Sequence, residues 1–460
     1  TFITAGASTA AGLAAPASNV LPTGYSVNAG KVAVTTSGAA MTIKQSTDKA
    51  SLNWNSFSVG QDASVNVQQN NANSVLLNRV VGNEASQIFG KISANGQMVL
   101  INQNGIVFGK SGSVTSSAFT ASTFNLSDDD FANGNYNYVR NGSKAGITNQ
   151  GSIIATEQGG YIALIGANVS NEGSLKTVQG PVIMTAGDAV ALPSAMTSNI
   201  QVPLSRKVRL ELLPSTINAM VANTESGVIT TDGGQVLMHA AAVSDAVANI
   251  SANVVNSGKI DTTGVQGGAV TLQADDGYIK ANGSITANST GSDNNNQPLK
   301  GGDIIIGRDE QTGALAKATD VSGARLESNK GFVETSGQHL DSLGVNVKAG
   351  QWLLDPTNIE ITLDGTVVTP GNSGVKASDI ATALNGGTSV TISTGTTGSS
   401  SSTSGVNQTT ASATNNAAGT IAVNSAITST YSGSSNPTLT LSAASNISIN
   451  AAILAASATV

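Results

Sequence analysis

The side chains best suited to acid–base chemistry are three adjacent aspartates and two histidines. Asp128, Asp129 and Asp130 lie in a stretch that reads as a loop, and His239 and His339 are 100 residues apart within repeated phrases. Enzymes that cleave polysaccharides gather their acids and bases in one groove. Three neighbouring acids are more typical of a solvated loop, and each histidine is more typical of an ordinary strand or loop position. We therefore expect no catalytic residues and no enzyme activity.

Motifs for nucleophiles, phosphates and metals are missing from the sequence. It contains no Gly-x-Ser-x-Gly elbow, no phosphate-binding loop, no zinc spacing and no calcium-binding nonapeptide. Cysteine is absent, which excludes disulfides and thiolate metal ligands. We expect no metal site and no cofactor.

Two tryptophans could serve as platforms on which sugars stack. Trp54 and Trp352 each stand beside apolar residues. Such neighbours favour packing inside the fold over carbohydrate binding.

The composition is typical of strands with a narrow core. Of 460 residues 51 are Gly, aromatic residues make up 3% and charged residues 11%, against roughly 25% charged in ordinary globular proteins. Small and β-branched side chains fill a core only where sheets lie close together. A net charge of −7 without a basic stripe argues against nucleic acid as a partner. No apolar run reaches the roughly 18 residues of a membrane helix, so we expect no stable membrane insertion.

Two phrases repeat along the chain in alternation. One has the form Asn-x-Gly followed by a strand, as at Asn149, Asn171 and Asn256, and the other has the form Gly-Gly followed by a strand, as at Gly159 and Gly267. A unit of 22 to 26 residues with strands and no helices predicts coils that stack into a parallel β-helix. Asn and Gly suit the corners, where Asn side chains could also stack as amide ladders.

Composition also predicts how the chain is divided. Residues 1–17 read as the remnant of a secretory signal peptide, with a disordered leader as the alternative. Residues 18–365 carry the repeats, and residues 19–60 could cap the first edge. Pro193 to Pro214 interrupt the repeats and suggest a hairpin standing off the coils, or else a disordered loop. Residues 366–419 read as a Ser/Thr/Gly-rich linker, and 420–460 as the start of further β-helical repeats.

Several phrases in a fixed order give a resemblance to a known family. They are SLNWNSFSVG (51–60), LNRV and VG (77–82), QIFG (87–90), GQMVLINQNGI (96–106), FTAST (119–123), KGFVETSG (330–337) and WLLDP (352–356). Together they resemble the amino-terminal secretion domain of two-partner secretion exoproteins. The last two phrases resemble the high-molecular-weight-type adhesins most closely, within a family that includes the filamentous haemagglutinins.

The resemblance implies a fold and a route. The implied fold is all-β, a right-handed parallel β-helix with an amino-terminal cap and extra-helical β-hairpin strands. The implied route runs through the periplasm of a Gram-negative bacterium to an outer-membrane Omp85-type β-barrel transporter with POTRA domains. The exoprotein then folds at the cell surface or is secreted.

The residues implied in transporter recognition are a corner loop and a nearby pair. The loop is Asn102, Gln103, Asn104, Gly105 and Ile106, in which Gln103 stands where the family has Pro. Pro would preset one turn dihedral, so Gln103 leaves a freer backbone.

The pair is Asn78 and Arg79. Its arginine is conspicuous in a charge-poor repeat. It could contact the transporter, form an ion pair with Glu84, or donate to a corner carbonyl.

The function expected from these observations is that of a large secreted adhesin, a virulence factor that attaches to a host cell-surface receptor or glycan. Its amino-terminal β-helix would direct export and template the folding of the rest. The alternatives are the secretion domain of a cytolysin or of a contact-dependent toxin carrier, and a glycan-binding lectin.

Overall fold

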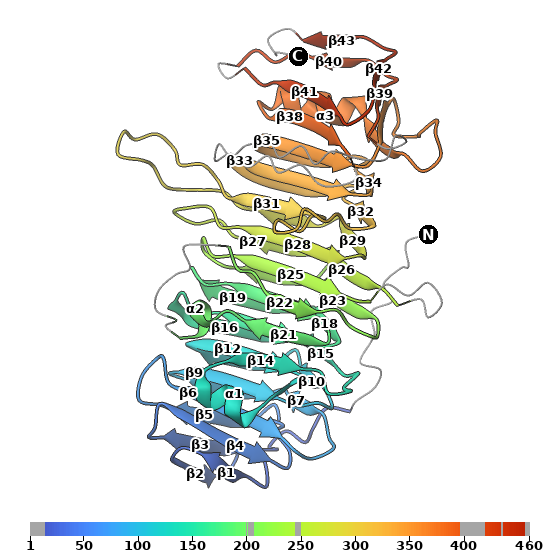
Figure 1. The fold of residues 1–460 in the computed structure, drawn as a ribbon. Coiled ribbons are helices and arrows are strands. Elements are labelled where there is room, and N and C mark those ends of the chain that lie inside the picture. The colour runs from blue at the N-terminus through green and yellow to red at the C-terminus, as the bar shows by residue number, and fades with distance from the viewer. Residues whose placement is uncertain are drawn as a thin grey trace. The chain divides into compact units, whose positions relative to one another are not determined.

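The computed structural model describes residues 14–198, 200, 207–243, 250–395, 419–433 and 436–455. Its contacts divide the chain into two compact units, Thr1–Ser251 (unit 1) and Ala252–Val460 (unit 2). This division falls inside the segment 18–365 that the sequence suggested as one domain. Within each unit the chain turns corner after corner, and strands of successive coils lie one above another (Figure 1).

Unit 1 begins with a cap of four strands. These are β1 (Ser26–Ala29), β2 (Val32–Ser37), β3 (Ala40–Gln45) and β4 (Lys49–Trp54). Strand β1 pairs with β4 and β2 with β3, both antiparallel. Strands β3 and β4 also pair in parallel with the next coil. The antiparallel pairs therefore protect the first edge of a parallel stack.

The parallel strands of unit 1 form three columns, to each of which a coil contributes at most one strand. Column 1 is β3, β5 (Ser64–Gln68), β8 (Lys91–Ala94), β11 (Ser113–Ser116), β16 (Ser152–Gln158), β19 (Ser174–Val178) and β24 (Val228–Thr230). Column 2 is β4, β6 (Val75–Val80), β9 (Gln97–Ile101), β12 (Ala118–Ser122), β17 (Ile162–Ile165), β20 (Val182–Ala186) and β25 (Val236–Ala241). Column 3 is β7 (Ser86–Ile88), β10 (Ile106–Phe108), β15 (Gly146–Asn149), β18 (Asn168–Asn171) and β23 (Ala219–Asn223).

The register stacks like side chains on like inside the coils. One aliphatic ladder runs through six coils of column 1, each member at most 1% exposed: Val65, Ile92, Val114, Ile153, Leu175 and Ile229. Burying such a side chain stabilises the fold by roughly 1.5–3 kcal/mol. Medium-sized aliphatic residues are thus enough for this core, as the composition indicated.

An amide ladder runs along the corner after column 3. Asn149 donates from Nδ2 to Oδ1 of Asn171 at 2.7 Å, and Asn171 donates in the same way to Asn223 at 2.8 Å. All three side chains are buried. The predicted stacking of corner asparagines is confirmed at these repeats.

A second layer covers the outer face of column 2 in unit 1. It is a four-stranded antiparallel sheet of β13 (Asn125–Leu126), β14 (Tyr136–Val139), β21 (Ala189–Leu192) and β22 (Glu211–Leu213), with the short helices α1 (Asp128–Asn133) and α2 (Ser194–Thr197). Leu77, Val99 and Ile101 of column 2 form one buried cluster with Tyr138 and Val190 of this layer. Column 2 is therefore buried on both faces, and Figure 1 shows α1, β14 and β21 in front of it.

The interruption between Pro193 and Pro214 belongs to this layer. Strand β22 leaves the coils, as predicted, and pairs with β21. However, Ile200 and Val208 are buried in the same cluster. The described residues of this segment therefore pack against the coils, because their apolar side chains have a surface to cover there, and do not stand off them.

Unit 2 repeats the three-column arrangement. Column 1 is β27 (Lys259–Asp261), β30 (Ser284–Thr286) and the first parts of β33 (Arg325–Gly337) and β35 (Asn346–Pro356). Column 2 is β28 (Val270–Asp275), β31 (Asp303–Ile306), the later parts of β33 and β35, β38 (Ser389–Thr394) and β41 (Leu439–Ala443). Column 3 is β26 (Ala252–Asn256), β29 (Tyr278–Ala281), β32 (Ala318–Asp320), β34 (His339–Asp341), β37 (Ser373–Lys376), β36 (Ile359–Thr362), β39 (Ile421–Val423) and β42 (Ile447–Ile449). Strands β40 (Ile427–Ser429) and β43 (Ile453–Ala455) pair with each other in parallel.

Part of the segment suggested as a linker is folded. Residues 373–394 form β37, helix α3 (Ala377–Asn385) and β38. Within a small and polar composition, Val375, Ile380, Leu384, Val390 and Ile392 recur at helix and strand spacing and are buried. Residues 396–418 of that segment lie outside the described residues, as do residues 1–13 of the suggested signal remnant.

Among the described helices, none is long and apolar enough to cross a membrane.

Candidate functional site

The loop Asn102–Gly105 is a corner of unit 1. It joins β9 of column 2 to β10 of column 3, and each of these strands pairs with neighbouring coils and not with the other. Gly105 donates its N–H to the carbonyl of Asn102 at 3.1 Å, which closes a four-residue turn. Gly105 has φ +115°, a value that a side chain would strain.

Asn102 points inward and holds this corner to the coil before it. Its side chain is fully buried. Its Nδ2 donates to the carbonyl of Glu84 at 2.9 Å and to Oγ of Ser86 at 3.0 Å. Its Oδ1 accepts from the backbone N–H of Asn104 at 2.9 Å. Asn102 is thus an internal brace of two successive corners.

Gln103 and Asn104 are the exposed side chains of the corner. Asn104 donates to the carbonyl of Gly82 at 2.9 Å, on the preceding coil. Gln103 donates to the carbonyl of Arg140 at 3.4 Å and accepts at its own carbonyl from Oγ of Ser143 at 2.8 Å. Amide groups of this kind offer both donors and acceptors to a binding partner.

Arg140, whose carbonyl accepts from Gln103, is a residue that the sequence motifs did not single out. Its guanidinium donates to Asp188 at 2.6 Å, to Oγ1 of Thr216 at 2.8 Å and to the carbonyl of Ser143 at 3.2 Å. Burial raises the pKa of Asp188, but the hydrogen bonds from Arg140 and Thr216 outweigh it and hold that pKa below 3.8. The available signal was an arginine in a chain with only 11% charged residues.

Asn78 lies inside the coils on β6. Its Oδ1 accepts from Nε1 of Trp54 at 3.0 Å, and its Nδ2 faces the carbonyl of Val99 at 3.4 Å. The side chain is fully buried. In the folded protein Asn78 therefore satisfies a buried indole.

Arg79 points to the opposite face and holds the second layer. It forms an ion pair with Asp128 at 2.8 Å and donates to the carbonyl of Leu126 at 2.7 Å. Burial raises the pKa of Asp128, but hydrogen bonds from Arg79 and Asn28 lower it below 3.8. Glu84 is not among its described partners, and the carbonyl that it meets, that of Leu126, belongs to strand β13 of the second layer and not to a corner of the coils.

The pair and the corner are adjacent in space. In the pairing of β6 with β9, Asn78 lies opposite Leu100 and Arg79 opposite Ile101. Ile101 directly precedes Asn102, and Ile106 begins the next strand with its side chain buried. The fold therefore brings all of these residues to one edge of column 2, although only Gln103 and Asn104 are exposed there.

Replacing Gln103 by proline is expected to stabilise unit 1 by about 0.4–1 kcal/mol, because residue 103 is the second position of the turn and proline narrows the unfolded ensemble. No described group accepts a hydrogen bond from the backbone N–H of Gln103, so proline removes no backbone hydrogen bond. The side-chain bond to Arg140 is lost equally in the Gln103→Ala control. The measurement is urea unfolding followed by Trp54 fluorescence in a Trp352→Phe background. Gln103→Ala is the control, for which no gain is expected, and a loss of stability in Gln103→Pro would contradict the turn assignment.

The three aspartates and the two histidines lie in ordinary elements of the fold. Asp128, Asp129 and Asp130 form the first turn of α1 and not a loop, because Ser127 caps the helix by accepting from the N–H of Asp130. His239 is buried in β25. A hydrogen bond with Asp341 raises the pKa of His339 above 6.5. Among the described residues, no three His, Asp or Glu side chains are grouped as a metal site.

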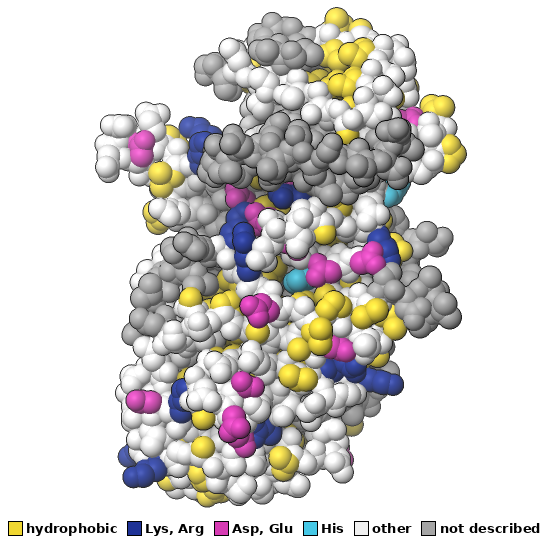
Figure 2. Space-filling model, viewed as in Figure 1, with side chains coloured by type: hydrophobic (Ala, Val, Ile, Leu, Met, Phe, Trp, Pro, Cys, Tyr) yellow, Lys and Arg dark blue, Asp and Glu magenta, His cyan; other side chains and the backbone are white. Residues whose placement is uncertain are grey.

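Both tryptophans are fully buried. Trp54 packs edge-on against Phe57, with ring centroids 5.3 Å apart, and Trp352 donates to Oγ1 of Thr335 at 3.1 Å. The packing interpretation is confirmed, since neither ring is open to a sugar. Charged side chains are scattered over the face drawn in Figure 2, and no basic stripe crosses its described residues.

Comparison with known proteins identifies relatives of this chain. The family model described as "TPS secretion domain" matches residues 18–286. A heme/hemopexin-binding protein of Haemophilus influenzae is 36% identical over 174 residues, which is 36% of this chain and 19% of that protein. A second protein of that name and species is 38% identical over 105 residues, which is 11% of its length. The chain therefore matches only a small part of these relatives.

Two solved structures are similar. The HMW1 secretion domain of Haemophilus influenzae has a TM-score of 0.54 and 25% identity, and the match covers 73% of this chain and 94% of that one. A filamentous hemagglutinin secretion domain has a TM-score of 0.37 and 12% identity over 72% of this chain and 97% of that one. The predicted fold class, a right-handed parallel β-helix with a cap and extra-helical strands, is confirmed, and so is the resemblance inferred from the motifs.

Proposed function

The chain belongs to the TPS secretion domain family, and we propose that residues 18–365 direct its export through a dedicated outer-membrane transporter. The match of the family model over residues 18–286 carries this proposal. The protein would pass through the periplasm of a Gram-negative bacterium and end secreted or at the cell surface. The transporter we propose is an Omp85-type β-barrel with POTRA domains.

The mechanism we propose is recognition of the chain before it folds. Most strands of unit 1 have only three to seven residues, and none can bury its apolar face without the coils beside it. Such segments are suited to adding a strand to an exposed sheet edge of a partner. The lack of cysteine removes crosslinks that would block passage of an unfolded chain.

Burial supports this order of events. Asn78 and Asn102 are fully buried after folding, and the side chain of Arg79 is 14% exposed. A transporter that reads these three residues must therefore meet them in the unfolded chain. Outside the cell the capped first coils would form, and each later coil would add to the exposed edge. Folding outside the cell would prevent the chain from moving back through the transporter, and no nucleotide hydrolysis would be needed.

Export can be tested in cells that also express the cognate transporter. Deleting residues 95–110 is expected to abolish secretion, and Gln103→Ala with Asn104→Ala is expected to lower the secreted fraction. The readout is the amount of protein in the medium against the periplasm. Because the two amides are exposed, the double variant separates recognition from stability.

The matched control for the double variant is Asn294→Ala with Asn295→Ala, two exposed amides beyond the family match. Normal export is expected for this control. Normal secretion of the deletion variant would sink the proposal for this region.

For the whole exoprotein we propose attachment to host cells through a receptor or glycan, with a cytolysin, a contact-dependent toxin carrier and a lectin as alternatives. The identity to two heme/hemopexin-binding proteins favours one further candidate, binding of heme or hemopexin. Cell-binding assays with purified protein, compared with capture on immobilised hemopexin and with heme titration, separate these functions.

A further inference from the structure

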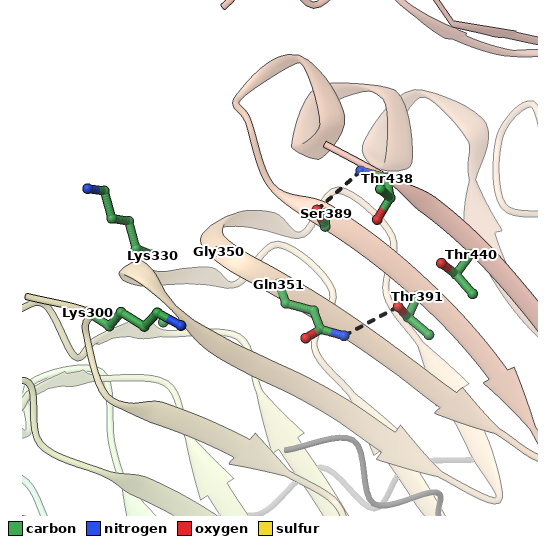
Figure 3. Close-up of a pocket in the computed structure, with 9 residues that line it drawn as sticks. Lys300, Lys330, Gly350, Gln351, Ser389, Thr391, Thr438 and Thr440 are labelled. Atoms are coloured by element: carbon green, nitrogen blue, oxygen red, sulfur yellow. Dashed lines mark hydrogen bonds between the residues drawn. The ribbon is translucent and has the colours of Figure 1, made fainter. Parts of the chain in front are cut away.

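Unit 2 carries a polar groove to which the export proposal assigns no role. It has a volume of about 350 Å³, at the lower end of the range of roughly 300–1,000 Å³ for ligand pockets. It lies along β33, β35, β38 and β41, which pair in that order (Figure 3). Its residues begin at Lys300, beyond the segment that the family model matches.

The floor of the groove is a ladder of hydroxyl and amide groups. Gln351 pairs with Ser389 across β35 and β38, and Thr391 pairs with Thr440 across β38 and β41. Successive strands are about 4.8 Å apart. Nε2 of Gln351 donates to Oγ1 of Thr391 at 3.4 Å. Hydroxyls both donate and accept, so the ladder suits a ligand that itself carries several hydroxyls.

Two lysines stand at one end of the groove. Figure 3 shows Lys300 extending toward Gln351 and Lys330 extending outward beside it. Within the described residues neither ammonium group forms an ion pair, in a chain whose net charge is −7. An ammonium group has donors and no acceptor. This end of the groove therefore favours an anionic group.

The backbone at Lys330 does not explain why a lysine is there. Lys330 has φ +56°, in the left-handed region, at the corner between columns 1 and 2. The equivalent corners of unit 1 carry Gly159 at φ +84° and Gln179 at φ +56°. Glycine or asparagine adopts this conformation at least cost. The side chain of Lys330 is also exposed. The property that distinguishes lysine from glycine or asparagine at this corner is therefore its charge.

We propose that this groove binds a short oligosaccharide bearing carboxylate or sulfate groups. The lysines would hold the anionic group, and the ladder of Gln351, Ser389, Thr391 and Thr440 would bind sugar hydroxyls. No aromatic side chain is among the described residues that line the groove, so these residues offer hydrogen bonds and charge as contacts. The proposal concerns folded unit 2, whereas the recognition proposed for export concerns the unfolded chain.

Saturation-transfer NMR titrations of the full chain test this proposal with three probes. A hyaluronan tetrasaccharide carries carboxylates only, a chondroitin sulfate tetrasaccharide adds sulfates, and chitotetraose is neutral. We expect both acidic probes to bind and chitotetraose not to. Lys300→Gln with Lys330→Gly should weaken binding about fivefold, as expected for two exposed charge contacts. Lys330→Gly suits the corner backbone and keeps the fold.

The control is Lys348→Gln, which removes an exposed charge from the same strand as Gln351 but outside the groove. It should leave binding unchanged. Equal weakening by the control and the groove variant would show that only overall charge matters and would overturn the proposal. Binding of chitotetraose as strong as that of the acidic probes, or no binding of either acidic probe, would also overturn it. A preference between the two acidic probes identifies which anionic group the lysines hold.

Discussion

Replacing Asn102 by leucine is expected to lower the free energy of unfolding of unit 1 by about 3 kcal/mol, because buried groups lose their hydrogen-bond partner. The carbonyl of Glu84, the hydroxyl of Ser86 and the N–H of Asn104 all bond to this one side chain. Leucine is similar in size but cannot bond to any of them. The measurement is urea unfolding followed by Trp54 fluorescence, with Trp352 replaced by Phe so that one tryptophan remains.

Asn104→Ala is the matched control for Asn102→Leu. Its amide is exposed and donates to the carbonyl of Gly82 on the neighbouring coil and to Oδ1 of Asn102 within the corner. We expect it to cost less than about 1 kcal/mol, the usual range of a partly solvated hydrogen bond. Equal losses of stability in the two variants would contradict the claim that the buried Asn102 stabilises this corner more than the exposed Asn104 does.

The second large effect is expected in unit 2, at the ion pair of Arg308 and Glu334. Both side chains are nearly inaccessible, and the guanidinium meets the carboxylate through two nitrogens. Arg308→Met leaves the carboxylate buried without its cation, which should cost about 3–5 kcal/mol. Urea unfolding followed by Trp352 fluorescence in a Trp54→Phe background reports the loss.

The double variant Arg308→Met with Glu334→Leu tests the cause. Removing both charges removes the unpaired ion, so we expect most of the lost stability to return. High salt should leave the wild-type value nearly unchanged, because buried pairs are poorly screened. A double variant as unstable as the single one would show that shape, and not charge, makes this position sensitive.

The sequence predicted the fold because the repeat is local. A corner Asn or Gly and a short apolar run recur every 22 to 26 residues, and each coil needs only its neighbours. The bond between Asn149 and Asn171, which are 22 residues apart, follows from that periodicity. Asn223 follows Asn171 only after 52 residues, because β21, α2 and β22 of the second layer lie between them in the chain.

The features that the sequence did not predict depend on contacts that occur once and are not repeated from coil to coil. Arg79 meets Asp128 and Leu126, which are far along the chain and outside the repeat. The three aspartates read as a loop because their helix is one short element with no repeated counterpart. Residues 373–394 read as a linker because composition outweighed the spacing of their few apolar side chains. Which asparagine of the corner turns inward depends on Glu84 and Ser86, on another coil.

The contacts of Gln103 also set an order in time. The corner is tied to Arg140, 37 residues later, and Arg140 is tied to Thr216, a further 76 residues on. In a chain delivered from its amino end, the corner forms early but receives its last ties only when Thr216 has arrived. Through most of such a delivery, the turn at Gln103 would be formed while the hydrogen bond between Arg140 and Thr216 is still missing.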